Sequence, residues 1–160
     1  MRFDISPKNY KNIFISSFGA FLCMLLISFL NSIDESNIWL IPPFGAILVL
    51  VMAVNDSKLA QPKNIFFGHL ITSIVGLIFL NFVPLPLFLI IPFAVGFGVG
   101  LMILLNVTHP PAGGNPIIVI LGSVSMDYLV SPIITGSIII LIFGVIINRF
   151  ILKKEYPILK

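Results

Sequence analysis

Long apolar runs separated by short polar segments dominate the chain. A helix needs about 20 residues to cross a hydrocarbon core of about 30 Å, and four runs reach that class, at residues 13–30, 64–82, 87–106 and 132–151. The first run follows basic residues as in a signal peptide, but no A-x-A-like cleavage site comes after it. We therefore expect four transmembrane helices, with the first one retained.

Two further apolar runs are shorter, at residues 43–54 and 111–124. As helices they would measure roughly 18 to 21 Å, too short to cross the membrane alone. Each begins at a proline pair, Pro42-Pro43 or Pro110-Pro111, which suits the first turn of a helix because proline has no amide hydrogen to leave unpaired there. The pattern predicts an all-α integral membrane protein with four full transmembrane helices and two short Pro-Pro-led helices.

The sequence also repeats itself at an offset of 68 residues. Adding this offset to five glycine or proline positions gives another glycine or proline; the pairs are Pro42 and Pro110, Pro43 and Pro111, Gly45 and Gly113, Gly68 and Gly136, and Gly76 and Gly144. Each half-repeat, roughly 13–82 and 87–151, contains a full helix, a short helix and a second full helix. Because an odd number of crossings per half inverts the second half, we interpret residues 1–160 as one transmembrane domain with an internal, inverted repeat.

Composition and charge agree with a membrane protein. Hydrophobic residues make up 58% of the chain, charged residues 9%, and the mean hydropathy is +1.14, values that exclude a water-soluble domain. A net charge of +3 can indicate nucleic-acid binding in a soluble protein, but here the bases lie at the termini and in one loop, so we expect no nucleic-acid partner.

The loop charges also predict the topology. Three crossings per half place all nine basic residues on one side, which the positive-inside rule makes the cytoplasm. We expect a multi-pass protein of the bacterial inner-membrane type with both termini cytoplasmic. If the short segments are re-entrant instead, Lys58 and Lys63 move outside, so only two lysines separate these alternatives.

Several kinds of chemistry are disfavoured. The single cysteine, Cys23, excludes an intramolecular disulfide, and two histidines with one cysteine do not make a metal site. All six acids lie in tails or loops, so no carboxylate pair or Ser-His-Asp arrangement has candidates inside the membrane. We expect no enzyme activity and no cofactor. Small residues at Gly68, Thr72 and Gly76 allow close helix packing and favour a homo-oligomer.

The densest cluster of special residues lies at 106–116. Prolines keep the residues before them out of a helix, and irregular backbone at membrane depth is tolerated only where protein or a water-filled cavity satisfies it. If residues 37–41 and 108–109 run extended, two short-helix N-termini face each other near the bilayer centre, where free amides and helix dipoles suit a small anion. The candidate binding residues are Asn106, Thr108, His109, Pro110, Pro111, Gly113, Gly114 and Asn115, with Pro42, Pro43, Gly45 and His69 from the first half.

The two histidines have two interpretations. An ionisable group inside a membrane is a functional candidate, and histidine exchanges a proton near neutral pH. Alternatively, each imidazole is bonded to a carbonyl and fixes a helix end, and Pro-Pro-Ala-Gly-Gly is a kinked loop without a ligand. Near the start of the 64–82 run, Gln61 and Asn64 are expected to cap that helix.

These residues resemble the HPP family of integral membrane proteins, named after the motif that His109, Pro110 and Pro111 carry here. The resemblance includes the segments 43–46 (Pro-Phe-Gly-Ala), 59–62 (Leu-Ala-Gln-Pro), 68–69 (Gly-His) and 108–113, and covers roughly residues 13–151. It implies four transmembrane helices and, because plant and cyanobacterial relatives are associated with nitrite transport, a small-anion transporter whose site includes the His-Pro-Pro residues and Gly113.

The sequence thus predicts a transporter or channel for a small, nitrite-like inorganic anion in a lipid bilayer. Two alternatives remain. One is a non-transporting scaffold or sensor with a dry, tightly packed centre, and the other is a channel for small neutral solutes, which would lack charge dependence.

Overall fold

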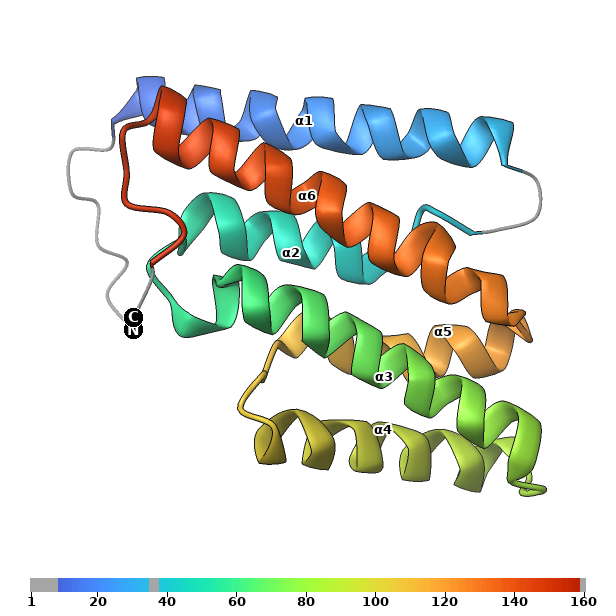
Figure 1. Cartoon of the computed structure of the whole chain (residues 1–160). Coiled ribbons are helices and arrows are strands. Elements are labelled where there is room, and N and C mark those ends of the chain that lie inside the picture. Colours follow the sequence, from blue (N-terminus) through green and yellow to red (C-terminus); the bar gives the residue numbers. More distant parts are fainter. Residues whose placement is uncertain (1–8, 35–37, 159–160) are drawn as a thin grey trace.

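The computed structural model describes residues 9–34 and 38–158, and every regular element in these ranges is helical (Figure 1). Four helical stretches of the described chain are long and apolar enough to cross a membrane: α1 (Tyr10–Ile33), α3 (Pro62–Phe82), α4 (Leu87–Leu104) and the kinked stretch Met126–Ile151, which contains α6 (Thr135–Val145). The predicted all-α membrane protein with four full spans is confirmed.

Short helical turns complete the chain. A 3₁₀ turn, η1, precedes α3, and the last span is built from α6 together with the turns η3, η4 and η5; their bounds are Lys58–Ala60, Met126–Leu129, Val130–Ile134 and Ile146–Ile151. The backbone is not helical at Ser131 (φ −124°, ψ 107°), so the helix that leads into α6 begins after this kink, where the apolar run at 132–151 predicted it.

The two short segments differ from each other. The first forms α2 (Pro42–Ala53), as predicted, whereas the second is divided into a 3₁₀ helix, η2 (Pro110–Gly114), and α5 (Asn115–Gly122). A single helix over 111–124 was therefore a wrong prediction. Pro116 has no amide hydrogen to donate to the Ala112 carbonyl, so the Asn115 amide donates to it instead and tightens the turn.

Each half of the chain passes three times between the two ends of the bundle (Figure 1). The backbone is extended at Ile41 (φ −101°, ψ 137°) and at His109 (φ −142°, ψ 104°), just before α2 and η2. This agrees with the prediction of extended backbone at these two positions. The Ile41 amide donates to the Trp39 carbonyl at 3.0 Å, so the chain turns at Leu40 and is not extended throughout, and position 37 lies outside the described residues. The short helices continue each extended stretch to an end of the bundle and do not turn back, so Lys58 and Lys63 lie at the same end as the start of α1 and the end of η5.

Helix packing exchanges partners between the halves. A Cβ atom added at Gly76 of α3 would lie 2.9 Å from Val119 Cβ of α5, and one added at Gly144 of α6 would lie 2.6 Å from Val51 Cγ1 of α2. The offset of 68 converts the first of these pairs into the second, because Gly76 corresponds to Gly144 and Val51 to Val119. The full helix of each half therefore packs closely on the short helix of the other half, as a two-fold exchange of the halves requires.

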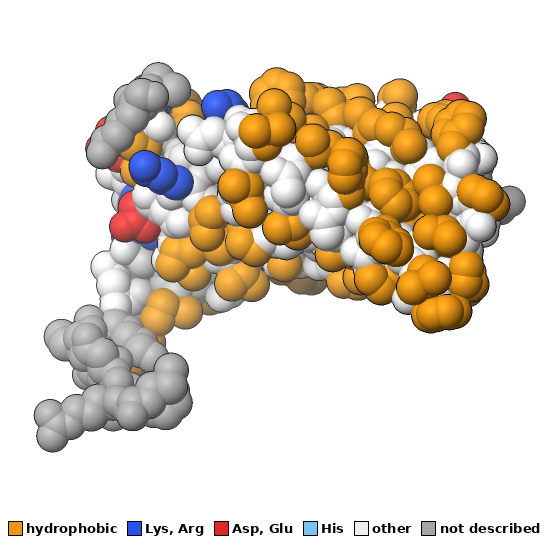
Figure 2. All heavy atoms as spheres, turned by 90° about the horizontal axis from the view of Figure 1, so that it is seen from below, with side chains coloured by type: hydrophobic (Ala, Val, Ile, Leu, Met, Phe, Trp, Pro, Cys, Tyr) orange, Lys and Arg blue, Asp and Glu red, His pale blue; other side chains and the backbone are white. Residues whose placement is uncertain are grey.

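One face of α2 lies in the apolar core, and the exterior of the bundle is apolar as well. Phe44, Ile47 and Val51 of α2 are fully buried, whereas Phe14, Phe21 and Phe29 of α1 are 57–69% exposed. Figure 2 shows hydrophobic side chains along the length of the bundle, with basic side chains gathered at one end. An apolar belt with charged ends is the surface of a multi-pass membrane-embedded protein.

Cysteine labelling tests this topology. We expect single cysteines placed at Lys58 and Lys154 to react with a membrane-impermeant maleimide from one side of the membrane, and a cysteine at Asp127 to react from the other. A Cys23→Ala background is suitable because Cys23 is fully buried in the apolar core. Labelling of positions 58 and 127 from the same side would contradict the three-pass arrangement.

Candidate functional site

The backbone break before η2 is held against the beginning of α3. His109 Nδ1 donates to the Leu59 carbonyl of η1 at 2.7 Å, and Asn64 Nδ2 donates to the Thr108 carbonyl at 2.9 Å. Gly68 allows the close approach, since a Cβ there would lie 2.9 Å from His109 Cβ. His109 is therefore fixed beside the second turn of α3, about 9 Å along that helix from Pro62.

A second polar group lies beside it, centred on Asn115 at the start of α5. Its amide nitrogen lies 2.9 Å from His69 Nδ1, 3.2 Å from the His69 carbonyl and 3.1 Å from Thr72 Oγ1. The Thr72 hydroxyl donates to the Gly68 carbonyl at 2.8 Å, so it accepts from Asn115. Asn115 thereby joins the second short segment to α3 and orients the His69 ring.

The partners of the two imidazoles define their neutral tautomers. A carbonyl can only accept, so His109 Nδ1 carries its hydrogen toward Leu59 and leaves Nε2 as an acceptor. His69 Nδ1 faces the donor amide of Asn115, so it accepts, and His69 Nε2 carries the hydrogen. The pair thus presents one donor and one acceptor.

These two Nε2 atoms form the centre of the candidate site. The ring centroids of His69 and His109 are 5.1 Å apart, and Phe44 of α2 lies against His69 with centroids 5.9 Å apart. Both histidines are fully buried, and neither Nε2 atom has a hydrogen-bond partner among the described residues. A buried polar atom without a partner is costly, so the pair is suited to a small guest that both accepts and donates a hydrogen bond.

The two short segments meet next to this pair, as the sequence predicted. A Cβ added at Gly114 would lie 3.5 Å from Pro43 Cγ, and α2 packs against η2. Their N-terminal amides are not free, however, contrary to the sequence-based expectation. The prolines have no amide hydrogen, Phe44 N donates to the Ile41 carbonyl at 3.0 Å, and Ala112 N donates to the His109 carbonyl at 3.1 Å. Anion recognition by those first amides is therefore not supported, and the imidazole pair is the better candidate.

The other candidate residues are not all gathered at the pair. Pro42, Pro110 and Asn106 are exposed, and Asn106 (φ 54°) ends the α4 segment. Gly45 faces an open groove between α1 and α2, while Gly113 is half-buried with no atom within 4 Å of an added Cβ. Pro111 and Thr108 are half-buried next to His109, so the compact part of the site consists of His69, His109 and Asn115.

The sequence reasoning missed the residues that hold the site in place. Asn64 does not cap α3, because its side chain reaches across to the His-Pro-Pro segment. Gln61 is the N-cap residue, but its amide donates to the carbonyls of Asn55 and Ser57, and its oxygen accepts from Ile158 N. No local signal in the sequence identifies such partners, because they are 44 and 97 residues apart along the chain in the two long-range cases.

Comparison with known proteins agrees with this architecture. A transmembrane protein of Dictyostelium discoideum is 29% identical over 150 residues, which are 89% of this chain and 53% of the relative. A second transmembrane protein of the same organism is 28% identical over 151 residues, which are 90% of this chain and 49% of the relative. The chain therefore spans about half the length of these relatives. No solved structure matches the chain.

The break that places His109 is also the motif after which a family of membrane proteins is named. The sequence matches the family described as "HPP, transmembrane region" over residues 5–157, a range that includes every helix described above. The chain belongs to the HPP transmembrane family.

Proposed function

We propose that the protein passes a small, nitrite-like inorganic anion across the membrane together with a proton, and that it is a transporter or channel, not an enzyme. The observation that carries this proposal is the buried imidazole pair. His69 Nε2–H offers a donor to an anion oxygen, and His109 Nε2 offers an acceptor to the accompanying proton. An anion with its proton presents both complementary groups, whereas a bare anion does not.

The position of the pair supports the same proposal. It lies where two broken, Pro-Pro-led segments meet inside a bundle of spanning helices, and such breaks in corresponding halves are typical of transporter binding sites. Histidines at membrane depth are expensive to bury and are usually retained for binding or proton transfer. Both arguments favour passage of a solute over a non-transporting scaffold.

A channel for a small neutral solute is the second candidate. The same donor and acceptor would also bind a neutral protic molecule, since the pair carries no net charge in the tautomers that its partners define. Replacing nitrite by other monovalent anions distinguishes the two, because neutral-solute passage is insensitive to the anion and gives no anion-coupled proton movement.

Flux in proteoliposomes tests the proposal. With an inward nitrite gradient, we expect the wild-type protein to carry nitrite faster than protein-free vesicles and to acidify the lumen, because each anion brings a proton. Gly113→Leu should reduce the flux, since the added side chain enters the open space beside the His-Pro-Pro segment. Gly100→Leu in α4 is the control because its Cβ also meets nothing within 4 Å. Flux no faster than in empty vesicles would contradict the proposal, whereas equal flux in the two variants would exclude Gly113 from the path.

A further inference from the structure

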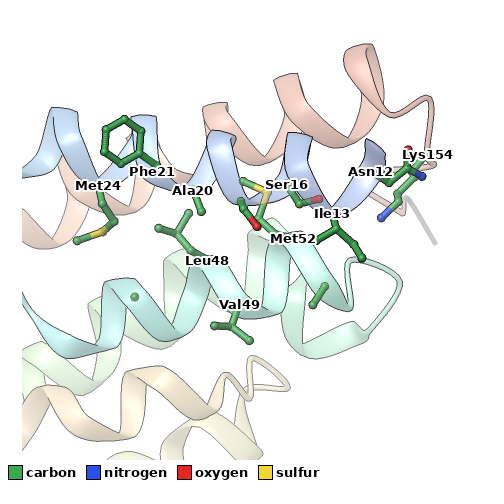
Figure 3. Close-up of a pocket in the computed structure, with 13 residues that line it drawn as sticks. Asn12, Ile13, Ser16, Ala20, Phe21, Met24, Leu48, Val49, Met52 and Lys154 are labelled. Carbon is green, nitrogen blue, oxygen red and sulfur yellow. The ribbon is translucent and has the colours of Figure 1, made fainter. Parts of the chain in front are cut away.

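An open groove of about 680 Å³ separates α1 from α2 (Figure 3), and neither His69 nor His109 lines it. Its α1 wall is the face from Asn12 to Met24, and its α2 wall is the face from Gly45 to Ala53. Small side chains such as Ala20, and Gly45 with no atom within 4 Å of an added Cβ, leave the space between the helices unfilled. The groove therefore offers a mainly apolar channel on the membrane-facing surface.

The groove has the depth of one membrane leaflet. Twelve residues separate Asn12 from Met24, which corresponds to about 18 Å along α1. Half of a hydrocarbon core of about 30 Å is roughly 15 Å. The groove thus extends from one end of the bundle to about its middle, which is the distance that a lipid acyl chain covers from the headgroup.

Its outer end is polar and basic. Lys154 and Asn12 lie at this end of the groove (Figure 3). Lys154 also lines a second cavity of about 260 Å³, formed with Arg149, Glu155 and the Tyr156–Pro157 pair. Among the described residues, this end of the bundle carries six basic residues and two acids: Lys11, Lys58, Lys63, Arg149, Lys153 and Lys154, with Asp56 and Glu155.

We propose that this groove binds one anionic phospholipid, with an acyl chain between α1 and α2 and the phosphate-bearing headgroup at Lys154 and Arg149. Basic pockets at the ends of transmembrane helices bind anionic headgroups, and the shared residue Lys154 connects such a pocket to an apolar groove of matching depth. A second copy of the chain suits the groove less well, because α1 and α2 carry no acidic residue to face Lys154.

Lipid titration of the delipidated protein in detergent tests this site. We measure the melting temperature and native mass spectra with dioleoyl phosphatidylglycerol or with zwitterionic dioleoyl phosphatidylcholine. The wild type should bind phosphatidylglycerol more tightly, by roughly fivefold for each basic residue at the anionic headgroup. Lys154→Gln should reduce this preference by about that factor because Arg149 remains, whereas Lys153→Gln should keep it, because Lys153 is exposed and lines neither cavity.

A filled groove provides the second test. Gly45→Leu should abolish the stabilisation by both lipids without loss of folding, since its side chain enters open space, and Gly100→Leu should behave as the wild type. Equal affinity of the wild type for the two lipids, or an unchanged preference in Lys154→Gln, would overturn the proposal. A lipid-free dimer that Gly45→Leu converts to a monomer would also overturn it, because a second copy would then occupy the groove.

Discussion

Leucine at Gly144 or Gly76 is expected to lower the melting temperature of the detergent-solubilised protein by roughly 2–10 °C, the range that follows from overpacking a helix contact by about 1–3 kcal/mol. At Gly144 the first added carbon would lie 2.6 Å from Val51 Cγ1, and at Gly76 it would lie 3.0 Å from the Pro116 Cα atom. The backbone of Pro116 cannot rotate away as a side chain can, so we expect Gly76→Leu to have the larger effect.

Gly100→Leu is the matched control, because it makes the same change in a spanning helix without a neighbour within 4 Å. We expect its melting temperature, measured by size-exclusion chromatography of heated samples, to stay within a few degrees of the wild type. If Gly76→Leu and Gly144→Leu are as stable as Gly100→Leu, the partner exchange between the halves is not what stabilises the bundle.

The spanning helices could be predicted from the sequence because length and hydropathy are local properties. The boundaries of α2 and α3 were predicted to within two residues of those in the structure. This was possible because a proline pair or a single proline ends one backbone conformation and begins another. The division of the second short segment at Gly114 could not be predicted in this way. It depends on the hydrogen bond that Pro116 cannot donate. The apolar pattern is continuous across this position and therefore predicts a single helix.

The candidate site was predictable only in part. Its residue types were visible because a histidine or an asparagine inside an apolar run is costly unless it is bonded. Their relative position was not visible, because Asn115 is 46 residues from His69 and His109 is 50 residues from Leu59. The offset of 68 also misleads here, since it assigns Ser137 to the place of His69 and Ile47 to that of Asn115. The two halves share packing positions but not polar chemistry.

Replacing His109 by asparagine is expected to reduce nitrite flux by roughly 10–100-fold while leaving the protein folded. The asparagine amide can occupy the place of Nδ1 and still donate to the Leu59 carbonyl, but it has no atom at the place of Nε2. Loss of one buried hydrogen bond to a charged or protonated guest corresponds to about 1.5–3 kcal/mol, which accounts for the expected range. Flux into proteoliposomes and the melting temperature, measured on the same preparation, check both parts.

His109→Gln should give the opposite combination of flux and stability. The longer side chain can place an amide oxygen near the position of Nε2 and accept a hydrogen bond from the guest, but it has no donor at the place of Nδ1 and leaves the Leu59 carbonyl unpaired. We expect it to melt at a lower temperature than the asparagine variant and to retain more flux. If His109 only fixes the His-Pro-Pro segment to η1, flux will instead follow stability, and the asparagine variant will be the more active of the two. The order of the two variants therefore separates binding at Nε2 from anchoring at Nδ1.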